Sequence, residues 1–414
     1  MTTSKLIYIR DQLEMEKIRY ERLNDLLHIM HVYRVEKQTA GRDEYGNYSM
    51  SKRRVKYRAL VENFLCTDVL DFVKTRDIRF SGTVHAVGSC SAGVSVSANE
   101  ADLLFMIDID GTLRDCEELP GYAKYQLSCS SLEKWKDCTT SEGYMMSRKM
   151  ASLFYHYVEE ALKSDLLTYN LAVSEDETSI TPVVRLTGIG TIATTVTVAY
   201  STTDIIDIDL VVAVSCKGLP PLATATWLQG KSSWPNSKSV EKIKESGFQL
   251  VSKAPYPLSE DEGTTLWRIS FSLAETILLQ DLDENIKAHG LCTKKCFVLM
   301  KFFRMGYLAP TERNVTPILK SYYLKVLLLF ECHEYPDPNF WTSDKLAERF
   351  LSMYQRLYTM IDDKRIPDFF MPAVNIMTSP LDAIRSNLRC LLHQPEEALK
   401  TWKSNMNKKF LLLL

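Results

Sequence analysis

The chain has 414 residues, of which 45% are hydrophobic and 25% charged, so it can bury a sizeable core and is long enough for two or more lobes, or for one large two-lobed unit. Its formal net charge of −2 argues against a protein that coats nucleic acid indiscriminately. No apolar segment has the length of a transmembrane span or a signal peptide, so we expect a cytoplasmic protein whose ten cysteines are reduced thiols rather than a disulfide framework.

The first elements along the chain are predicted to be helices. Apolar residues recur near helical spacing over residues 6–37, without Pro or Gly, which predicts one or two amphipathic helices that begin a spine between lobes. Residues 41–51 are polar and contain glycine, which predicts a loop. A second helix is expected from about residue 52 to residue 74.

Three carboxylates then follow in a pattern that suits magnesium. Glu100 and Asp102 are two residues apart, so both lie on one face of a strand if the apolar residues 103–109 form that strand. Asp209 comes 107 residues after Asp102, directly before the apolar residues 210–214, and is expected to arrive from a neighbouring strand. Nucleotidyl transfer uses two magnesium ions clamped by carboxylates, and magnesium prefers hard oxygen ligands. We therefore expect these three residues to bind Mg²⁺, or Mn²⁺ in its place.

The acidic pattern leaves alternatives open. Asp207 lies on the same strand face as Asp209, and either could be the third ligand; Asp209 is preferred because it stands directly before the apolar run. A Glu-x-Asp pair by itself is usually part of a solvated strand face. Asp108, Asp110 and Asp204 are expected to be solvated or edge carboxylates.

The remaining elements are predicted from glycines and from hydrophobic periodicity. Gly88 and Ser89 are expected to form a turn from a strand to a helix, whose amides and hydroxyl hold a triphosphate. Residues 115–141 predict an irregular segment that leads into a helix near 144–164, and the β-branched residues within 183–214 predict two or three strands. From Trp267 to near Lys403 the periodicity predicts helices.

The order Gly-Ser, Glu-x-Asp and distant Asp resembles that of the animal cGAS-like receptors and of the wider male-abnormal (Mab) family of nucleotidyltransferase-fold proteins. Five further blocks look like counterparts of family blocks, in the family order. They are Lys231-Ser-Ser-Trp-Pro235, Trp267-Arg-Ile-Ser-Phe-Ser272 with Glu275, Cys296-Phe-Val-Leu-Met-Lys301, Ser321-Tyr-Tyr-Leu-Lys325 and Phe369-Phe-Met-Pro-Ala-Val-Asn375. The resemblance covers about residues 50–385.

The resemblance implies a fold class and a division of the chain. The fold is α/β, a two-lobed nucleotidyltransferase fold with a mixed β-sheet that carries the carboxylates and a long N-terminal spine helix. We expect this core lobe and the spine in residues 1–265, and a C-terminal helical, Mab-type lobe in residues 266–414.

The resemblance also implies roles for the acidic residues and for the Gly-Ser turn. Ser89, beside Gly88, would hold the terminal phosphates of the donor nucleotide. Glu100, Asp102 and Asp209 would bind the metal ions, and Asp209 would also draw the acceptor hydroxyl toward the α-phosphate.

Four residues of the C-terminal blocks carry implied nucleotide-binding roles. Lys301 would neutralise phosphate charge, joined by Ser321, while Tyr322 would stack on a nucleobase. Arg268 would hydrogen-bond a base edge, although it could equally be the structural ion-pair partner of a carboxylate such as Glu275. The aromatic residues of these blocks are expected in the core: Trp267, Phe271, Phe369 and Phe370.

One departure from vertebrate cGAS concerns zinc. There, a zinc-binding insertion with a cysteine pair lies between the second and third of these blocks, whereas here that segment is only residues 276–295. His289, Cys292 and Cys296 have ligand-like spacing, but a structural zinc site needs four ligands, so Cys332 or His333 would have to be recruited. We expect no zinc, which favours double-stranded RNA over double-stranded DNA as the activating ligand.

Basic residues gather in two segments that could contact nucleic acid. Residues 1–60 hold 13 Lys and Arg against 8 Asp and Glu, and residues 285–325 hold 8 against 1. Such clusters are typical of a face that meets phosphates, although a basic helix face is often only solvated. The candidate nucleic-acid-binding residues are Lys52, Arg53, Arg54, Lys56, Lys294 and Lys295.

The leading hypothesis is a nucleotidyltransferase that is activated by double-stranded nucleic acid. It would join two nucleoside triphosphates such as ATP and GTP into a cyclic dinucleotide for a STING-like receptor in innate antiviral defence, without a membrane partner. Activation would order residues 89–99, which carry little side-chain bulk. The alternatives are a catalytically silent Mab-type protein that binds a nucleotide or a partner, and a synthase of linear oligonucleotides.

Overall fold

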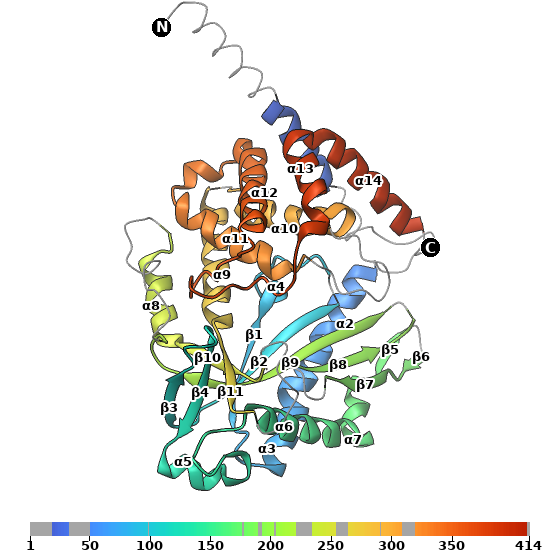
Figure 1. Cartoon of the computed structure of the whole chain (residues 1–414). Helices are drawn as coiled ribbons and strands as arrows, with labels where there is room; N and C mark the ends of the chain where they lie inside the picture. Colours follow the sequence, from blue (N-terminus) through green and yellow to red (C-terminus); the bar gives the residue numbers. More distant parts are fainter. Residues whose placement is uncertain are drawn as a thin grey trace, which may run out of the picture. The chain divides into compact units, whose positions relative to one another are not determined.

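The described residues of this computed structural model fall into two compact units (Figure 1). Described are residues 19–32, 50–97, 99–175, 178–188, 193–202, 204–220, 234–253, 264–289, 291–308 and 319–411. The sheet unit takes residues 39–223 and 238–279, and the helical unit takes residues 1–38, 224–237 and 280–414. The sequence-based division put residues 1–38 with the nucleotidyltransferase core and began the helical lobe at residue 266; here residues 19–32 belong to the helical unit.

A nine-stranded mixed sheet is the centre of the sheet unit. The pairing of β2 with β9 is parallel and the other pairings are antiparallel. Strand β9 pairs along one side with β2 and along the other with β8 and then β10. The strands, in spatial order, are β1 (Gly82–Val87), β2 (Glu100–Ile107), β9 (Ile205–Cys216), β10 (Phe248–Val251), β11 (Leu266–Ser270), β4 (Tyr122–Leu127) and β3 (Gly111–Asp115), with β7 (Val183–Thr187) on β8 (Thr194–Ala199) and β8 on β9.

Helices cover one face of this sheet. Strand β9 alternates fully buried residues such as Ile206 and Ile208 with half-buried ones, so its two faces differ. On the buried face Phe105 of β2 stacks on Phe154, at 5.6 Å between ring centroids. Phe154 belongs to helix α6 (Ser147–Leu162), and helix α2 (Met50–Phe64) packs against β2 and β9. The acidic residues of β2 and β9 therefore lie on the other face.

The predicted second helix is present and somewhat longer. It runs from Met50 through α2, a π-helical turn at Leu65–Val69 and α3 (Leu70–Arg76). Residues 19–32 are also helical, as the periodicity predicted, while the rest of that predicted segment lies outside the described residues. Shorter elements complete the sheet unit: α4 (Gly88–Ser91), α5 (Cys129–Lys134), α7 (Asp165–Thr168), α8 (Ser237–Ser246, which begins at the boundary residue) and the two-stranded sheet β5 (Val173–Glu175) and β6 (Thr178–Ile180).

Two segment predictions were wrong. Residues 115–141 are not irregular throughout, because β4 lies within them, pairs with β11 and buries its alternate residues Ala123 and Tyr125. The C-terminal region does not begin with a helix at Trp267, because Trp267 lies in β11 between β10 and β4. The prediction of strands within 183–214 is confirmed by β7, β8 and β9.

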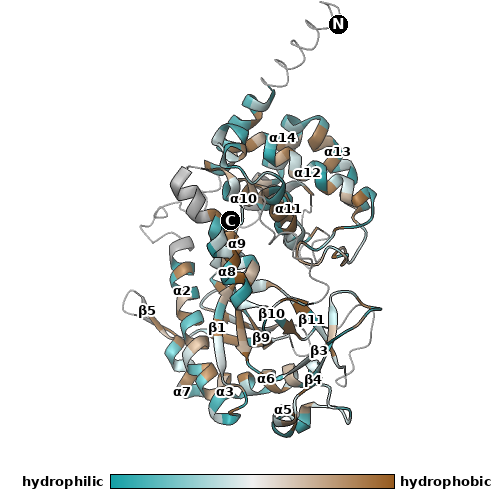
Figure 2. Ribbon diagram, turned by 90° about the vertical axis from the view of Figure 1, so that its left-hand side faces the viewer, coloured by the Kyte–Doolittle hydropathy of each residue, from teal (hydrophilic) through white to brown (hydrophobic). Residues whose placement is uncertain are grey.

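Helices make up the helical unit. In Figure 2 several of them, α12 among them, carry both hydrophilic and hydrophobic stretches, as amphipathic helices do. Their rings interlock, for example Phe303 of α10 against Phe350 and Tyr354 of α12 in edge-on contacts. Besides the helical residues 19–32, the α-helices described in this unit are α9 (Ser272–His289, which starts in the sheet unit), α10 (Thr293–Phe303), α11 (Ser321–Glu334), α12 (Leu346–Asp362), α13 (Arg385–His393) and α14 (Pro395–Leu411).

The four aromatic residues expected in the core are buried. Trp267 is 0% exposed, and Phe271, Phe369 and Phe370 are 4% exposed or less. No helix in the described ranges combines the length and the apolar character needed to cross a bilayer.

A buried ion pair fixes α12 against α11. The side chain of Glu331 is 0% exposed, and its Oε1 lies 3.0 Å from Nη1 of Arg349, which is 5% exposed. Oε2 of Glu331 lies 3.3 Å from Arg356, which also bonds the exposed Glu334. The guanidinium carbon of Arg349 lies 3.9 Å from the centre of the Tyr335 ring. The carboxylate of Glu331 and the guanidinium of Arg349 are thus both shielded from water, and each compensates the buried charge of the other.

Candidate active site

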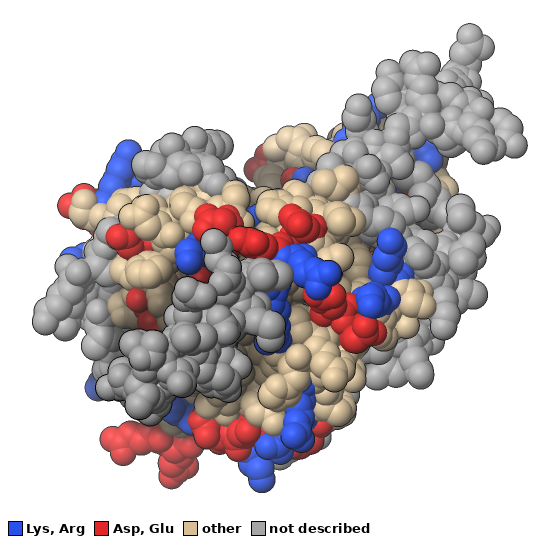
Figure 3. Space-filling view, turned by 90° about the horizontal axis from the view of Figure 1, so that it is seen from above, with Lys and Arg blue, Asp and Glu red and all other residues tan. Residues whose placement is uncertain are grey.

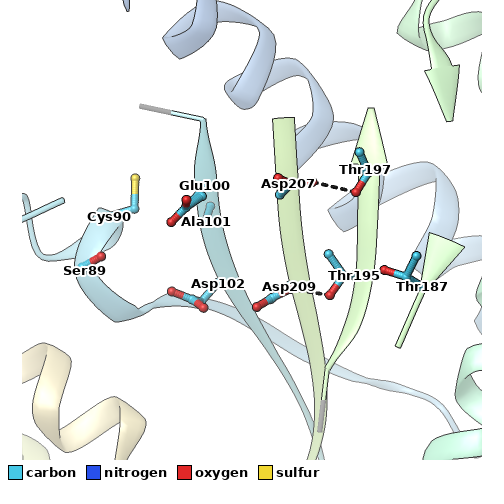
Figure 4. A pocket seen from close by; sticks show the side chains of 10 residues that line it. All are labelled: Ser89, Cys90, Glu100, Ala101, Asp102, Thr187, Thr195, Thr197, Asp207 and Asp209. Carbon is cyan, nitrogen blue, oxygen red and sulfur yellow. Dashed lines mark hydrogen bonds between the residues drawn. The ribbon is translucent and has the colours of Figure 1, made fainter. Parts of the chain in front are cut away.

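A cavity of about 390 Å³ lies at the amino ends of the parallel strands β2 and β9, wholly within the sheet unit (Figure 4). Acidic and hydroxyl side chains dominate its wall. It is lined by Ser89, Cys90, Glu100, Ala101, Asp102, Thr187, Thr195, Thr197, Asp207 and Asp209.

The strand register sets the carboxylates opposite one another in two rows. Glu100 is the pairing partner of Asp207, and Asp102 is the pairing partner of Asp209. Neighbouring strands lie about 4.8 Å apart, and residues two apart on one strand are separated by about 6.6 Å. Four carboxylates, two from each strand, therefore face one small volume, as Figure 4 shows.

Threonine hydroxyls from β8 hold both acids of β9. The Thr195 hydroxyl donates to Oδ1 of Asp209 and the Thr197 hydroxyl donates to Oδ1 of Asp207, each at 2.6 Å. Thr195 and Thr197 are not among the site residues predicted from the sequence. The alternation of Thr195 and Thr197 with Val196 and Val198 was a usable signal, because it places both hydroxyls on one face of a strand.

The Gly-Ser pair forms the expected turn from strand to helix. Strand β1 ends at Val87, α4 begins at Gly88, and Ser89 lines the cavity. Gly88 has φ +76, and a Cβ atom placed on it would lie only 2.0 Å from Oδ2 of Asp102. Only glycine fits here without moving the carboxylate, so the turn and the acidic strand constrain each other.

Cys90 is a further lining residue that the sequence analysis did not single out. Burial raises the pKa of its thiol, and the carboxylates of Glu62, Asp102 and Glu100 raise it further, against a lowering by Arg58. The thiol is therefore protonated as the site stands.

The chemistry of the donors fits magnesium or manganese. All four carboxylates supply hard oxygens, and the register brings them to one cavity. As the side chains are oriented, no three His, Cys, Asp or Glu groups converge closely enough to hold a metal ion anywhere in the described part of the chain. Since adjacent strands fix only the backbones, binding an ion requires the carboxylates to rotate inward.

The other predicted nucleotide-binding residues divide between the two units. Arg268 lies on β11, and the chain of pairings from Asp209 through Val251 places it on the same sheet face as the acids. It is half-buried beside Tyr122. Burial raises the pKa of Tyr122, and the charge of Arg268 offsets only part of this rise. The proposed alternative partner of Arg268, Glu275, is buried.

The remaining three lie in the helical unit. Lys301 is 5% exposed, with its ammonium 5.5 Å from the centre of the Phe297 ring. Ser321 is the exposed first residue of α11, and the hydroxyl of Tyr322 donates to Oδ2 of Asp368 at 3.1 Å.

The candidate nucleic-acid-binding residues differ in exposure. Lys56 is exposed and Lys294 is 8% exposed. The Lys295 ammonium contacts Nδ1 of His28, and burial lowers the pKa of Lys295. The side chain of Lys52 lies outside the described residues. On the face seen in Figure 3 basic and acidic side chains are interspersed.

Arg53 and Arg54 make a contact that the sequence did not predict. Both approach Asp204, at 2.9 Å and 3.4 Å. Asp204 is 2% exposed, so the expectation of a solvated carboxylate was wrong. Two guanidiniums compensate this buried charge and tie α2 to the turn that leads into β9.

Three cysteines considered for zinc are buried in the helical unit. Burial raises the pKa of Cys292 to about 12 and that of Cys296 and Cys332 well above the ordinary value. These thiols are therefore protonated as they stand. The side chain of His289 lies outside the described residues.

Two segments of the chain match models of known protein families. Residues 95–281 match the Mab-21 protein nucleotidyltransferase domain, and residues 292–394 match the Mab-21 protein HhH/H2TH-like domain. The first match contains the four carboxylates of the cavity and Arg268, while the second contains Lys301, Ser321 and Tyr322. The two matches follow one another along the chain and cover most of it. The chain therefore belongs to the cGAS and Mab-21 family of nucleotidyltransferase-fold proteins.

Proposed function

We propose that the protein is a nucleic-acid-activated synthase of a cyclic dinucleotide, made from two nucleoside triphosphates such as ATP and GTP and recognised by a STING-like receptor. One observation carries the proposal: Glu100, Asp102 and Asp209 face one cavity from two strands in register, beside Ser89 of the Gly-Ser turn. A protein that only bound a nucleotide would have no need for a third carboxylate that could act on an acceptor hydroxyl.

The carboxylates would hold Mg²⁺ or Mn²⁺. When bound, such ions neutralise phosphate charge and lower the pKa of a coordinated hydroxyl. The chain itself positions the acids: the hydroxyl of Thr195 fixes Oδ1 of Asp209, which leaves Oδ2 to turn toward the cavity. Asp209 would accept the proton of the attacking hydroxyl, and Ser89 would hold the terminal phosphates of the donor.

The remaining roles follow the family resemblance. We propose that Arg268 hydrogen-bonds a base edge from the acidic face of the sheet, since its planar guanidinium suits that task. In the helical unit, Lys301 and Ser321 would bind phosphate and Tyr322 would stack on a base. The bond from Tyr322 to Asp368 supports this role because it holds the far end of the phenol ring in place.

Double-stranded RNA is the proposed activator, with α2 as one contact. Lys56 is exposed on α2, while Arg53 and Arg54 on the same helix contact Asp204, close in the chain to Asp207 and Asp209. Residues 89–99 lead into β2, and the amide of Asp207 donates to the Asn99 carbonyl at 2.8 Å. We propose that nucleic acid bound to α2 alters the order of this segment.

Product analysis tests the proposed function. The purified full chain is incubated with radiolabelled nucleoside triphosphates, Mg²⁺ or Mn²⁺, and double-stranded RNA or DNA, and phosphatase-resistant products are resolved. We expect a cyclic product with RNA. A product with DNA only would contradict the choice of RNA, linear oligonucleotides would support the alternative synthase, and no product with either ligand would favour the silent Mab-type protein.

Replacement of Gly88 by alanine should cost activity beyond its cost in stability. The positive φ disfavours alanine by about 1–2 kcal/mol, and the added Cβ, 2.0 Å from Oδ2 of Asp102, must displace that carboxylate. A displacement of about 1 Å in a reacting group can reduce turnover roughly 10²-fold. Initial rates and thermal midpoints of the full chain measure the two effects.

Gly143→Ala is the matched control. Gly143 has φ +80, but a Cβ there would have its nearest neighbour at 3.8 Å, in Leu132, so the backbone strain is similar and the clash is absent. Gly143→Ala should lose stability through the backbone strain alone and keep full activity, whereas Gly88→Ala should lose activity as well. Equal rates in the two would contradict the role given to the turn.

A further inference from the structure

Asp207 repeats the environment of Asp209 one step along the strand. Each acid accepts a 2.6 Å bond on Oδ1 from a threonine of β8, and each stands opposite a carboxylate of β2. Asp207 thus has the same three attributes that make Asp209 a candidate ligand: a facing carboxylate, an orienting hydroxyl and a place in the cavity wall. A carboxylate that was only solvated would have no need of the orienting bond.

The backbone around the pair Glu100 and Asp207, the outer pair, is also held in place. The amide of Asp207 donates to the Asn99 carbonyl at 2.8 Å, and the side-chain amide of Asn99 donates to the Ile205 carbonyl at 3.1 Å. These bonds join the residues just before Glu100 to those beside Asp207. The backbones of the outer pair are therefore held together across the two strands, as those of the inner pair, Asp102 and Asp209, are by the strand pairing.

The charge of the cavity favours cations without help from a nucleotide. Its wall holds four carboxylates and, among the described residues that line it, no Lys, Arg or His. Two divalent ions carry four positive charges. Three carboxylates would leave one of these charges for the triphosphate to balance, whereas four carboxylates balance both ions.

We propose that Asp207 is a fourth cation-binding carboxylate of this site, paired with Glu100, and that the protein binds divalent cations before a nucleotide arrives. The inference rests on the proposed function, since it concerns the same cavity. Thr197 acts as a positioning residue: its hydroxyl bonds Oδ1 of Asp207, so that Oδ2 is the oxygen that would turn to a cation.

Manganese binding without nucleotide tests the inference. Mn²⁺ is titrated into the full chain and the free ion is measured by electron paramagnetic resonance, while Mg²⁺ is titrated in parallel and the thermal midpoint is followed. Wild type should bind Mn²⁺, and Asp207→Asn should bind it roughly 10- to 100-fold more weakly, the range found when groups that support a metal site are removed. The matched control is Asp108→Asn, which replaces an exposed carboxylate just after the same strand β2.

A second variant covers the case in which Asp207→Asn fails to fold. Thr197→Val keeps the shape of the side chain and suits a strand, but removes the orienting hydroxyl. It should also weaken Mn²⁺ binding, by less than Asp207→Asn. Unchanged Mn²⁺ affinity in Asp207→Asn, or in Thr197→Val where that variant stands in, would overturn the proposal, and so would a wild type that binds Mn²⁺ only with a nucleotide.

The outcomes separate this inference from the proposed function. Product formation by wild type, together with Mn²⁺ affinity that Asp207→Asn does not change, would sink the inference and leave the function. Nucleotide-free Mn²⁺ binding that depends on Asp207, in a protein that makes no product with any activator, would support the inference and sink the proposed function.

Discussion

Asp209→Asn should reduce product formation by roughly 10³-fold or more, because residues that act together in catalysis lose most of their effect when one is removed. The change is nearly isosteric, and the asparagine oxygen can still accept the bond that Thr195 gives to Oδ1. What is lost is the charge that holds cations and the ability to accept a proton. The rate is measured as phosphatase-resistant product with the activator that supports wild-type turnover.

The fold is not expected to suffer in this variant. Asp209 is half-buried at the edge of the cavity, and its neighbours Ile208 and Leu210 on the opposite face of β9 make the packing contacts. The thermal midpoint should therefore stay within a few degrees of wild type, and Asp108→Asn should keep full activity. A variant at Asp209 that makes product at the wild-type rate would rule out this carboxylate as a catalytic residue.

Glu331→Gln should lower the stability of the helical unit by about 3–5 kcal/mol, the usual cost of removing one partner from a buried ion pair. The glutamine oxygen could still accept a bond from Arg349, whose side chain is 5% exposed, but the buried negative charge would be lost and only the partly exposed Glu348 would remain as a charged partner. Chemical denaturation of the full chain, followed by circular dichroism, measures the shift of the transition.

Two comparisons separate burial from charge. Glu334→Gln, on the same helix but 51% exposed, should cost no more than about 1 kcal/mol. Replacing Glu331 and Arg349 together by methionine should cost less than Glu331→Gln alone, because no unpaired charge remains. Equal shifts in the two single variants would show that the buried pair contributes no more than a surface one.

The acidic layout was accessible to sequence reasoning because it depends on local rules. Glu100 and Asp102 share a face since they are two apart on a strand, and the apolar run after Asp209 predicted a second strand. The choice between Asp207 and Asp209 could not be made in the same way. Both face the cavity, and each has its own partner on β2, so the register and not the sequence pattern defines their environment.

Other features depend on contacts between distant segments. Strand β11 begins a run whose apolar periodicity predicts a helix, yet pairing with β10 and β4 makes residues 266–270 a strand. Asp204 belongs to a turn that nothing in its neighbourhood marks as buried, and it is covered because Arg53 and Arg54 of α2 reach it. Such burial is decided by tertiary packing, which no window of the sequence contains.

The parallel pairing of β2 with β9 has a consequence for how the protein folds. Asp102 and Asp209 are 107 residues apart in the chain and become neighbours only through this pairing. Contacts of such long sequence separation form late, because the chain must close a large loop before any bond repays the lost entropy. The cavity lined by the four carboxylates therefore comes into existence only when this long-range pairing has formed. A chain in which β2 and β9 have not yet paired has the four carboxylates of the cavity on separate strands, so the acidic site and the centre of the sheet form in the same step.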